Sequence, residues 1–176
     1  MARSIRKKAV IQTERLTLKP YSKQDTNGLI DILTAPEVTD TFMVPEMESR
    51  RCLEELVQKL IVFSQIEDDK HLEYGIYLKG QLIGFVNDCG IEDDEIEIGY
   101  AIHPRYQGQG YAAEAVRAVM TELREMGFQR IAAGYFSENT ASLRVMQKCG
   151  MQQTDQTEEI EYRGRKHICR YCELCF

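Results

Sequence analysis

The sequence lacks several features that would define a class of protein at once. It has no run of about 18 apolar residues, so we expect no membrane-spanning helix and no membrane partner. Basic residues are not in excess either, because 22 Lys and Arg against 28 Asp and Glu give a net charge of −6. We therefore expect no nucleic-acid partner, since such binding needs a basic face, and the negative charge mildly favours a cationic substrate.

Linkers, internal repeats and low-complexity segments are also missing. The length of 176 residues then predicts one domain, over residues 12–176, after a loose basic N-terminal arm at residues 1–11. No apolar segment follows the arm, so we expect no secretory signal. The six cysteines are accordingly predicted to be thiols in a reducing cytoplasm.

Hydrophobic periodicity predicts a mixed α/β (α+β) chain, with Gly and Pro marking the ends of elements. The expected helices are one after the capping box at 22–25 that ends near residue 33, one that Ser49 starts, 111–126, and a short one from Asn139. The expected strands are 15–21, 72–79, 81–88, 94–102, 129–136 and two that flank the turn at 163–165. Residues 36–47 carry two prolines and are predicted to be an irregular loop.

The order of these elements predicts a mixed, mostly antiparallel central sheet with helices on both faces. Strands 94–102 and 129–136 are joined through the predicted helix 111–126. A crossover of this kind joins parallel strands and is right-handed. We therefore expect one parallel pair within an otherwise antiparallel sheet.

Two glycines, Gly108 and Gly110, directly precede the predicted helix 111–126. A helix N-terminus offers unpaired N–H groups and a positive dipole end, and glycine lets an anion approach them closely. The loop therefore suits a phosphate or pyrophosphate, with a tight turn that binds nothing as the alternative. The letters "GQGYAA" also fit a dinucleotide fingerprint, although that motif should open the fold and precede an acidic residue about 20 positions on.

Two ordered segments carry a resemblance to a known family. Residues 96–115, "IEIGYAIHPRYQGQGYAAEA", and 138–151, "ENTASLRVMQKCGM", resemble the GNAT superfamily of acetyl-CoA-dependent N-acetyltransferases. The opening "TERLTLKPYSKQD" at 13–25 resembles its ribosomal-protein N-terminal (Rim-type) branch. The resemblance covers about residues 12–176. It implies a GNAT fold and transfer of an acetyl group from acetyl-CoA to a primary amine, by direct attack in a ternary complex.

The resemblance also implies which residues bind acetyl-CoA. The family's loop motif Q/R-x-x-G-x-G/A, matched by Gln107, Gly110 and Ala112, would hold the pyrophosphate through backbone amides. Strands 94–102 and 129–136 would splay apart and leave unpaired amides for the pantetheine arm. The predicted cofactor-binding residues are Ile102, His103, Gln107, Gly108, Gln109, Gly110, Tyr111, Ala112, Asn139, Ser142 and Lys148.

Two residues are candidates for the proton transfers. Glu97 lies where related enzymes often carry a carboxylate and is the candidate base, with a hydrogen-bonded strand residue as the alternative. Many members protonate the departing thiolate with a tyrosine, but Met146 occupies that position here and cannot donate. Ser142, one turn earlier, is the predicted substitute, unless it only gives the cofactor room.

Other interpretations of the sequence assign the protein to a different functional class. Cys169, Cys172 and Cys175 lie near His167, but residues three apart on a strand point to opposite faces, so no metal site is expected. A non-catalytic sensor of acyl-CoA and a dinucleotide-binding protein are the alternative functions. The acceptor stays open between a protein N-terminus and a small-molecule amine, and a homodimer is compatible with the family.

Overall fold

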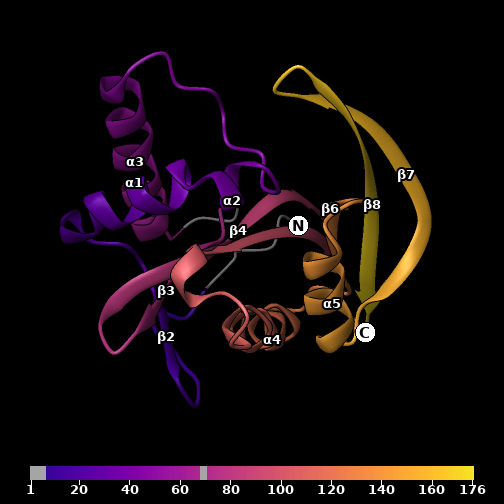
Figure 1. Cartoon of the computed structure of the whole chain (residues 1–176). Coiled ribbons are helices and arrows are strands. Elements are labelled where there is room, and N and C mark those ends of the chain that lie inside the picture. The colour runs from indigo at the N-terminus through magenta and orange to yellow at the C-terminus, as the bar shows by residue number, and fades with distance from the viewer. Residues whose placement is uncertain (1–6, 68–70) are drawn as a thin grey trace.

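The computed structural model describes residues 7–67 and 71–176, which form an eight-stranded sheet with helices on both faces (Figure 1). The strand order is β1-β2-β3-β4-β5-β6-β8-β7. Within it β5 and β6 pair in parallel and the other neighbours are antiparallel. The predicted mixed sheet and its parallel crossover are both confirmed.

The bounds of most elements agree with the sequence prediction. The strands are β1 Ile11–Gln12, β2 Leu16–Lys19, β3 Glu73–Leu78, β4 Gln81–Glu92, β5 Glu95–Ile102, β6 Arg130–Phe136, β7 Gln152–Tyr162 and β8 Arg165–Cys175. The helices are α1 Thr26–Thr34, α2 Pro36–Thr39, α3 Arg50–Gln65, α4 Tyr111–Glu125 and α5 Thr140–Lys148. The expectation of an irregular loop over 36–47 is wrong at its start, because Pro36 suits the first position of a helix and α2 begins there.

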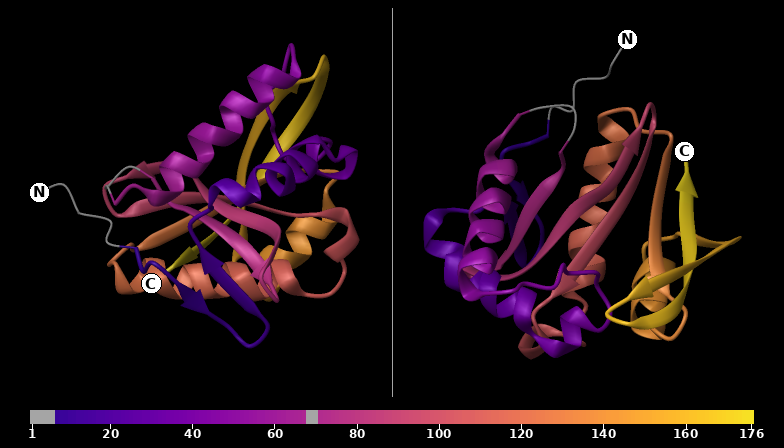
Figure 2. Two further views of the ribbon diagram at one scale, coloured as in Figure 1. Left: turned by 90° about the vertical axis from the view of Figure 1, so that its left-hand side faces the viewer. Right: turned by 90° about the horizontal axis from the view of Figure 1, so that it is seen from above.

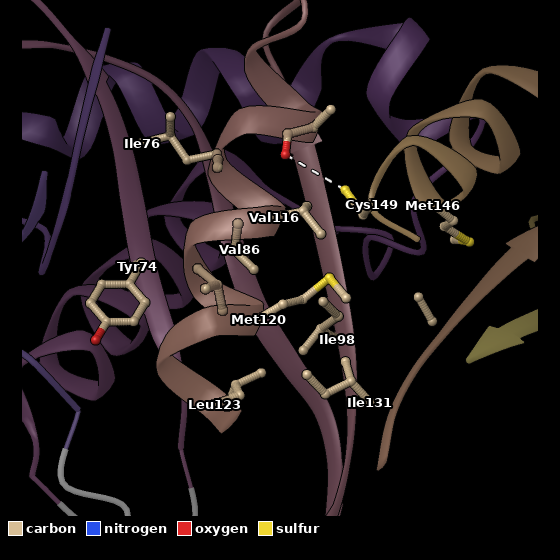
Figure 3. Close-up of a cluster of buried hydrophobic side chains, with 14 of the residues drawn as sticks. Tyr74, Ile76, Val86, Ile98, Val116, Met120, Leu123, Ile131, Met146 and Cys149 are labelled. Atoms are coloured by element: carbon tan, nitrogen blue, oxygen red, sulfur yellow. Dashed lines mark hydrogen bonds between the residues drawn. The ribbon is translucent and has the colours of Figure 1, made fainter. Parts of the chain in front are cut away.

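Helices α1, α2 and α3 cover one face of the sheet, and α4 and α5 cover the other (Figures 1 and 2). On the α4 side, Val116, Met120 and Leu123 pack with Ile98 and Ile131 in one buried cluster (Figure 3). A second cluster joins the inward faces of α1, α2 and α3 to strand residues that include Phe85 and Ala101. These two clusters identify which face of the sheet each strand residue occupies.

Side-chain caps start the helices where the sequence predicted. Ser22 and Asp25 form the expected capping box before α1. The hydroxyl of Ser49 accepts a hydrogen bond from the N–H of Cys52 at the start of α3. Asn139 caps α5 through its Oδ1, which accepts from the N–H of Ser142 at 3.2 Å. Such caps occupy backbone donors that have no partner inside the helix.

The predicted N-terminal arm is anchored at its described end. Residues 1–6 lie outside the described residues. Lys8 donates its backbone N–H to Glu122 at 2.9 Å and pairs its ammonium with the same carboxylate at 2.8 Å. The hydroxyl of Tyr74 donates to the carbonyl oxygen of Lys8. The expectation of a loose arm is therefore wrong for this part, because these contacts attach it to α4 and β3.

None of the helices in the described part of the chain combines the length and apolar character that crossing a bilayer requires. The cysteines of residues 169–175 are free thiols, and Cys169 and Cys172 are buried. Their neighbour His167 pairs through Nδ1 with Glu138 at 2.5 Å and stacks on the ring of Phe136. This histidine therefore packs the start of β8 against the end of β6.

Candidate active site

Strands β5 and β6 separate after only three paired residues. Their parallel pairing runs from Glu95 opposite Arg130 to Glu97 opposite Ala132. Beyond that point β5 stays paired with β4, and β6 stays paired with β8. The two strands therefore diverge, as predicted, and a cleft of about 670 Å³ opens between them.

The cleft passes through the sheet from one face to the other. Successive strand residues point to opposite faces. On β5, Ala101 packs with α1 and α3, so Glu97 and Gly99 share that face. Ile98 and Ile102 pack with α4, and Tyr100 shares their face. Residues of both sets line the cleft, so we call the α1–α3 side the acceptor wall and the α4–α5 side the donor wall.

Backbone pairing shows which amides of β5 face the gap. The N–H of His103 donates to the carbonyl oxygen of Ile83 at 2.7 Å. Hydrogen bonds of an antiparallel ladder alternate, so the N–H groups of Tyr100 and Ile102 point away from β4 and toward the gap. The N–H of His103 is therefore already used by β4, and the prediction that this residue contacts the cofactor through backbone atoms stays a prediction. Ile102 retains the predicted position.

The glycine loop ends at the N-terminus of α4. Gly108 and Gly110 have φ values of 75° and 84°, a region that glycine adopts without strain. The N–H groups of Gly108, Gln109 and Gly110 meet no hydrogen-bond acceptor in the described part of the chain. The first amides of α4 also lack intrahelical acceptors. The loop therefore presents successive unpaired donors at a positive helix end, as an anion site requires.

Two residues of the loop fix its shape. The side-chain amide of Gln107 donates to the carbonyl oxygen of Ile102 at 2.9 Å and so ties the loop to the end of β5. Gln109 does not line the cleft, and its carbonyl accepts from Arg15 at 3.0 Å. Arg15 also pairs with Glu114 at 2.7 Å and lies over the ring of Tyr111. Sequence reasoning missed Arg15, because it lies far from the loop in the chain.

A pair of hydroxyls stands on the donor wall. Tyr100 on β5 and Ser142 on α5 bring their hydroxyl oxygens to 2.9 Å. Burial raises the pKa of Tyr100 above the usual phenol value, so this hydroxyl keeps its proton. Met146, at the position of the family's tyrosine, is fully buried in the core (Figure 3). Ser142 was identified from the sequence, but Tyr100 was missed. The only signal for Tyr100 was its position, as an aromatic residue in the strand segment predicted to splay.

Glu97 lies on the acceptor wall where the pairing of β5 and β6 ends. Its carboxylate is half-buried and forms no hydrogen bond or ion pair with the described residues. Burial, and then the nearby charge of Glu158, raises the pKa of Glu97 above the usual carboxyl value. Both effects favour the form that holds a proton, so this group is suited to accepting one.

The structure brings most of the predicted site residues to one cleft. The lining includes Glu97, Ile102, Gln107, Gly108, Gly110, Tyr111, Ala112, Asn139, Ser142 and Lys148. His103 and Gln109 lie outside it. The exposed cations of the lining, Arg144 and Lys148, both stand on α5.

Known proteins share this architecture. A family model described as "Acetyltransferase (GNAT) domain" matches residues 15–152. The uncharacterized N-acetyltransferase YoaA of Bacillus subtilis is 27% identical over 161 residues, which cover 88% of this chain and 89% of YoaA.

Two solved structures show the same fold. A GNAT-family acetyltransferase from Bacillus anthracis has a TM-score of 0.80 at 23% identity, covering 94% of this chain and 98% of that chain. RimL, a ribosomal L7/L12 alpha-N-protein acetyltransferase in complex with coenzyme A, has a TM-score of 0.82 at 20% identity, covering 94% and 97%.

The fold, the cleft and the family match together define an acetyl-CoA-dependent acyltransferase. The chain belongs to the GNAT acetyltransferase family, because the family model covers well over half of it. Membership identifies the thioester acetyl-CoA as the donor that the family uses. The dinucleotide interpretation is based on the glycine loop alone. That loop matches the loop motif of this family, so no dinucleotide needs to be invoked.

Proposed function

We propose that this protein transfers the acetyl group of acetyl-CoA to a primary amine, by direct attack while both substrates occupy the cleft. The observation that carries the proposal is the gap between β5 and β6, which leads to the unpaired amides of residues 108–110. One opening connects the two walls, so a thioester on the donor wall can meet an amine on the acceptor wall.

The donor wall would bind coenzyme A along its length. The amides of Gly108 to Ala112 would hold the pyrophosphate, and the N–H of Ile102 would bond the pantetheine arm or the thioester carbonyl. Lys148 would approach a phosphate of the nucleotide. Asn139, which already caps α5, would touch the pantetheine through its amide nitrogen.

The reaction itself needs two proton transfers. The amine nitrogen attacks the thioester carbon, a C–N bond forms, and the C–S bond breaks. An amine must be neutral to attack, so Glu97 would take its proton, directly or through a water molecule. Ser142, hydrogen-bonded to Tyr100, would give a proton to the departing thiolate. The remaining contribution is the placement of the two reactants side by side.

The acceptor is an amine held on the acceptor wall, in the cytoplasm. A protein N-terminus is one class, because the structural neighbour RimL is described as an alpha-N-protein acetyltransferase. A small-molecule amine is the other class, and a homodimer is compatible with either. The domain responsible would be residues 12–176.

Two measurements test the proposal. Calorimetry should detect binding of acetyl-CoA, and thiol release should exceed the uncatalysed rate for at least one amine in a panel. Binding without turnover in any panel would instead support a non-catalytic sensor of acyl-CoA. The variants Glu97→Gln and Ser142→Ala test the acetyltransferase against the non-catalytic sensor further. In an acetyltransferase, both substitutions should lower turnover while the binding of acetyl-CoA persists.

A further inference from the structure

Two acceptors on the acceptor wall that are withdrawn from solvent have no hydrogen-bond donor among the described residues. One is the carboxylate of Glu97, described above. The other is the Oδ1 atom of Asn87 on β4, which is buried and has no hydrogen-bond partner among the described residues. A buried polar oxygen without a partner costs about 1–3 kcal/mol, so a ligand that supplies a donor there gains affinity.

The orientation of the Asn87 amide is fixed by its neighbour. Its Nδ2 donates to the carbonyl oxygen of Asp88 at 3.2 Å, so Oδ1 must point the other way. That direction leads over Gly99, where a methyl group added to the glycine would lie 3.0 Å from Oδ1. The same methyl group would lie 2.9 Å from the Phe42 ring and 2.9 Å from the sulfur of Cys89. Three side chains therefore converge beside the gap.

Asn87 and Glu97 lie on the same wall of the cleft. Asn87 pairs with Gly99 across β4 and β5, and Glu97 is two residues before Gly99 on the same strand. Diagonal neighbours of this kind on adjacent strands are about 7–8 Å apart in space. One small molecule can therefore place N–H groups on both oxygens.

The acceptor wall offers no uncommitted side-chain hydroxyl within the described residues. Thr41 donates its hydroxyl to the carbonyl of Glu37 at 2.9 Å, and Tyr171 donates to Glu158 at 2.9 Å. A peptide brings carbonyl oxygens that need donors, whereas the ammonium group of a protonated alkyl amine brings donors only. The wall therefore matches the alkyl amine better.

The charges of the lining point the same way. Its cations, Arg144 and Lys148, stand on α5, whereas Glu37 and Glu97 stand on the acceptor wall. The lining also includes Phe42, Met43 and Ile160, whose apolar side chains suit methylene groups. A carboxylate on the acceptor molecule would meet like charge at this wall, whereas a second ammonium group would be attracted.

We propose that the acceptor is a small aliphatic diamine or polyamine, whose second amino group is bound at Asn87 Oδ1 while Glu97 faces the amino group that attacks the thioester. This inference rests on the proposed acetyl transfer and names its substrate class. One amino group becomes acetylated at the gap, while the other holds the chain of methylene groups along the apolar part of the wall.

Three small acceptors of similar length and one peptide test the substrate class: 1,4-diaminobutane, 1-aminobutane, 4-aminobutanoate and a tetrapeptide with a free N-terminal serine. With the full chain and saturating acetyl-CoA, kcat/KM from thiol release should be at least about tenfold higher for the diamine than for 1-aminobutane. 4-Aminobutanoate should be the poorest small acceptor. Added salt should weaken the preference for the diamine, since screening weakens attraction between exposed charges.

Asn87→Ala should bring kcat/KM for the diamine to within about threefold of that for 1-aminobutane, mainly by raising KM for the diamine. Asn27→Ala on the exposed side of α1 is the matched control and should keep the preference. Binding of coenzyme A, measured by calorimetry, shows that each variant is folded.

The outcomes separate the two proposals. Equal or better turnover of the tetrapeptide or of 4-aminobutanoate would overturn the diamine assignment and leave the acetyl transfer standing. An unchanged diamine preference in Asn87→Ala would overturn the role of Asn87. Binding of coenzyme A without thiol release from any acceptor would overturn the transferase proposal, and this inference with it.

Discussion

The hydroxyl oxygens of Tyr100 and Ser142 lie 2.9 Å apart and join β5 to α5 across the donor wall of the cleft. The phenol is also within 3.1 Å of the backbone carbonyl of Ser142. A strand residue and a helix residue thus share a hydrogen bond beside the position that the departing thiolate would occupy. Under the proposed mechanism, this contact would support Ser142 as the proton donor in place of a tyrosine at the position of Met146.

Ser142→Ala should lower kcat by about 100-fold if Ser142 protonates the thiolate, since positioned acids contribute on this scale. Tyr100→Phe should cost about tenfold, because it removes only the partner of that acid. Steady-state kinetics measures both. The control is Tyr135→Phe, since the Tyr135 hydroxyl is buried in the same region without a hydrogen-bond partner among the described residues. An unchanged kcat in Ser142→Ala would show that this residue only gives the cofactor room.

Glu97→Gln should remove the acidic limb of the pH dependence of kcat/KM and lower its maximum by about 100-fold. A base works only when deprotonated, so activity of the wild type should rise with pH through the pKa of Glu97. That pKa is raised by burial and by Glu158, so the limb should lie above the usual carboxyl range.

Glu158→Gln provides the matched test of this assignment. Gln keeps an oxygen for the Tyr171 hydroxyl but removes the negative charge near Glu97. The pKa of Glu97 should then fall, and the acidic limb should move to lower pH with little change in the maximum. A limb that stays in place would assign it to another group, such as the amine substrate.

The fold was predictable from the sequence wherever periodicity and local chemistry agree. The capping serines Ser22 and Ser49, the glycines after the helices and the alternation of β5 indicated the elements and the parallel crossover correctly. The anchored segment at Lys8 was not predictable, because its partner Glu122 is 114 residues away and no local pattern links them.

In the candidate site, too, local motifs were predictable from the sequence and long-range contacts were not. The glycine loop and Ser142 belong to local motifs, so the sequence located them. Tyr100, Asn87 and Arg15 were missed because only strand register and long-range packing place them beside the cleft or its glycine loop. The pairing of the His103 N–H with β4 was not predictable, because sequence alone does not show which strand amides are already paired.

Gly108→Ala should weaken the binding of acetyl-CoA by about tenfold, because a left-handed backbone costs an L-residue roughly 1–2 kcal/mol and the free loop would relax away from the conformation that presents its amides. No protein atom lies within 4 Å of the added methyl group, so a steric clash within the fold would not explain a loss of affinity. Gly164→Ala, in the β7–β8 turn at φ 71° and also in open space, is the matched control. Calorimetry should show weaker binding for the first variant alone. Equal affinity in both would contradict an anion site at the loop.

Glu73 should make the stability of this protein depend on pH. Burial raises the pKa of its carboxyl group to about 8, against 4.5 for a free carboxyl, and the Tyr21 hydroxyl donates to it at 2.6 Å. Between these pH values the folded state holds a proton that the unfolded state has released. The free energy of unfolding should therefore fall as pH rises from 4.5 to about 8, by up to about 1.4 kcal/mol per pH unit.

Glu73→Gln should flatten this dependence, because the amide cannot ionise and still accepts the hydrogen bond from Tyr21. Urea denaturation at pH 5, 6, 7 and 8 measures the effect as the difference between wild type and variant, on the order of a few kcal/mol at the upper end. Glu55→Gln on the exposed face of α3 serves as the control, since its side chain is 60% exposed. Parallel pH profiles for wild type and Glu73→Gln would mean that the buried carboxyl is ionised in the folded protein, with Lys7 balancing its charge.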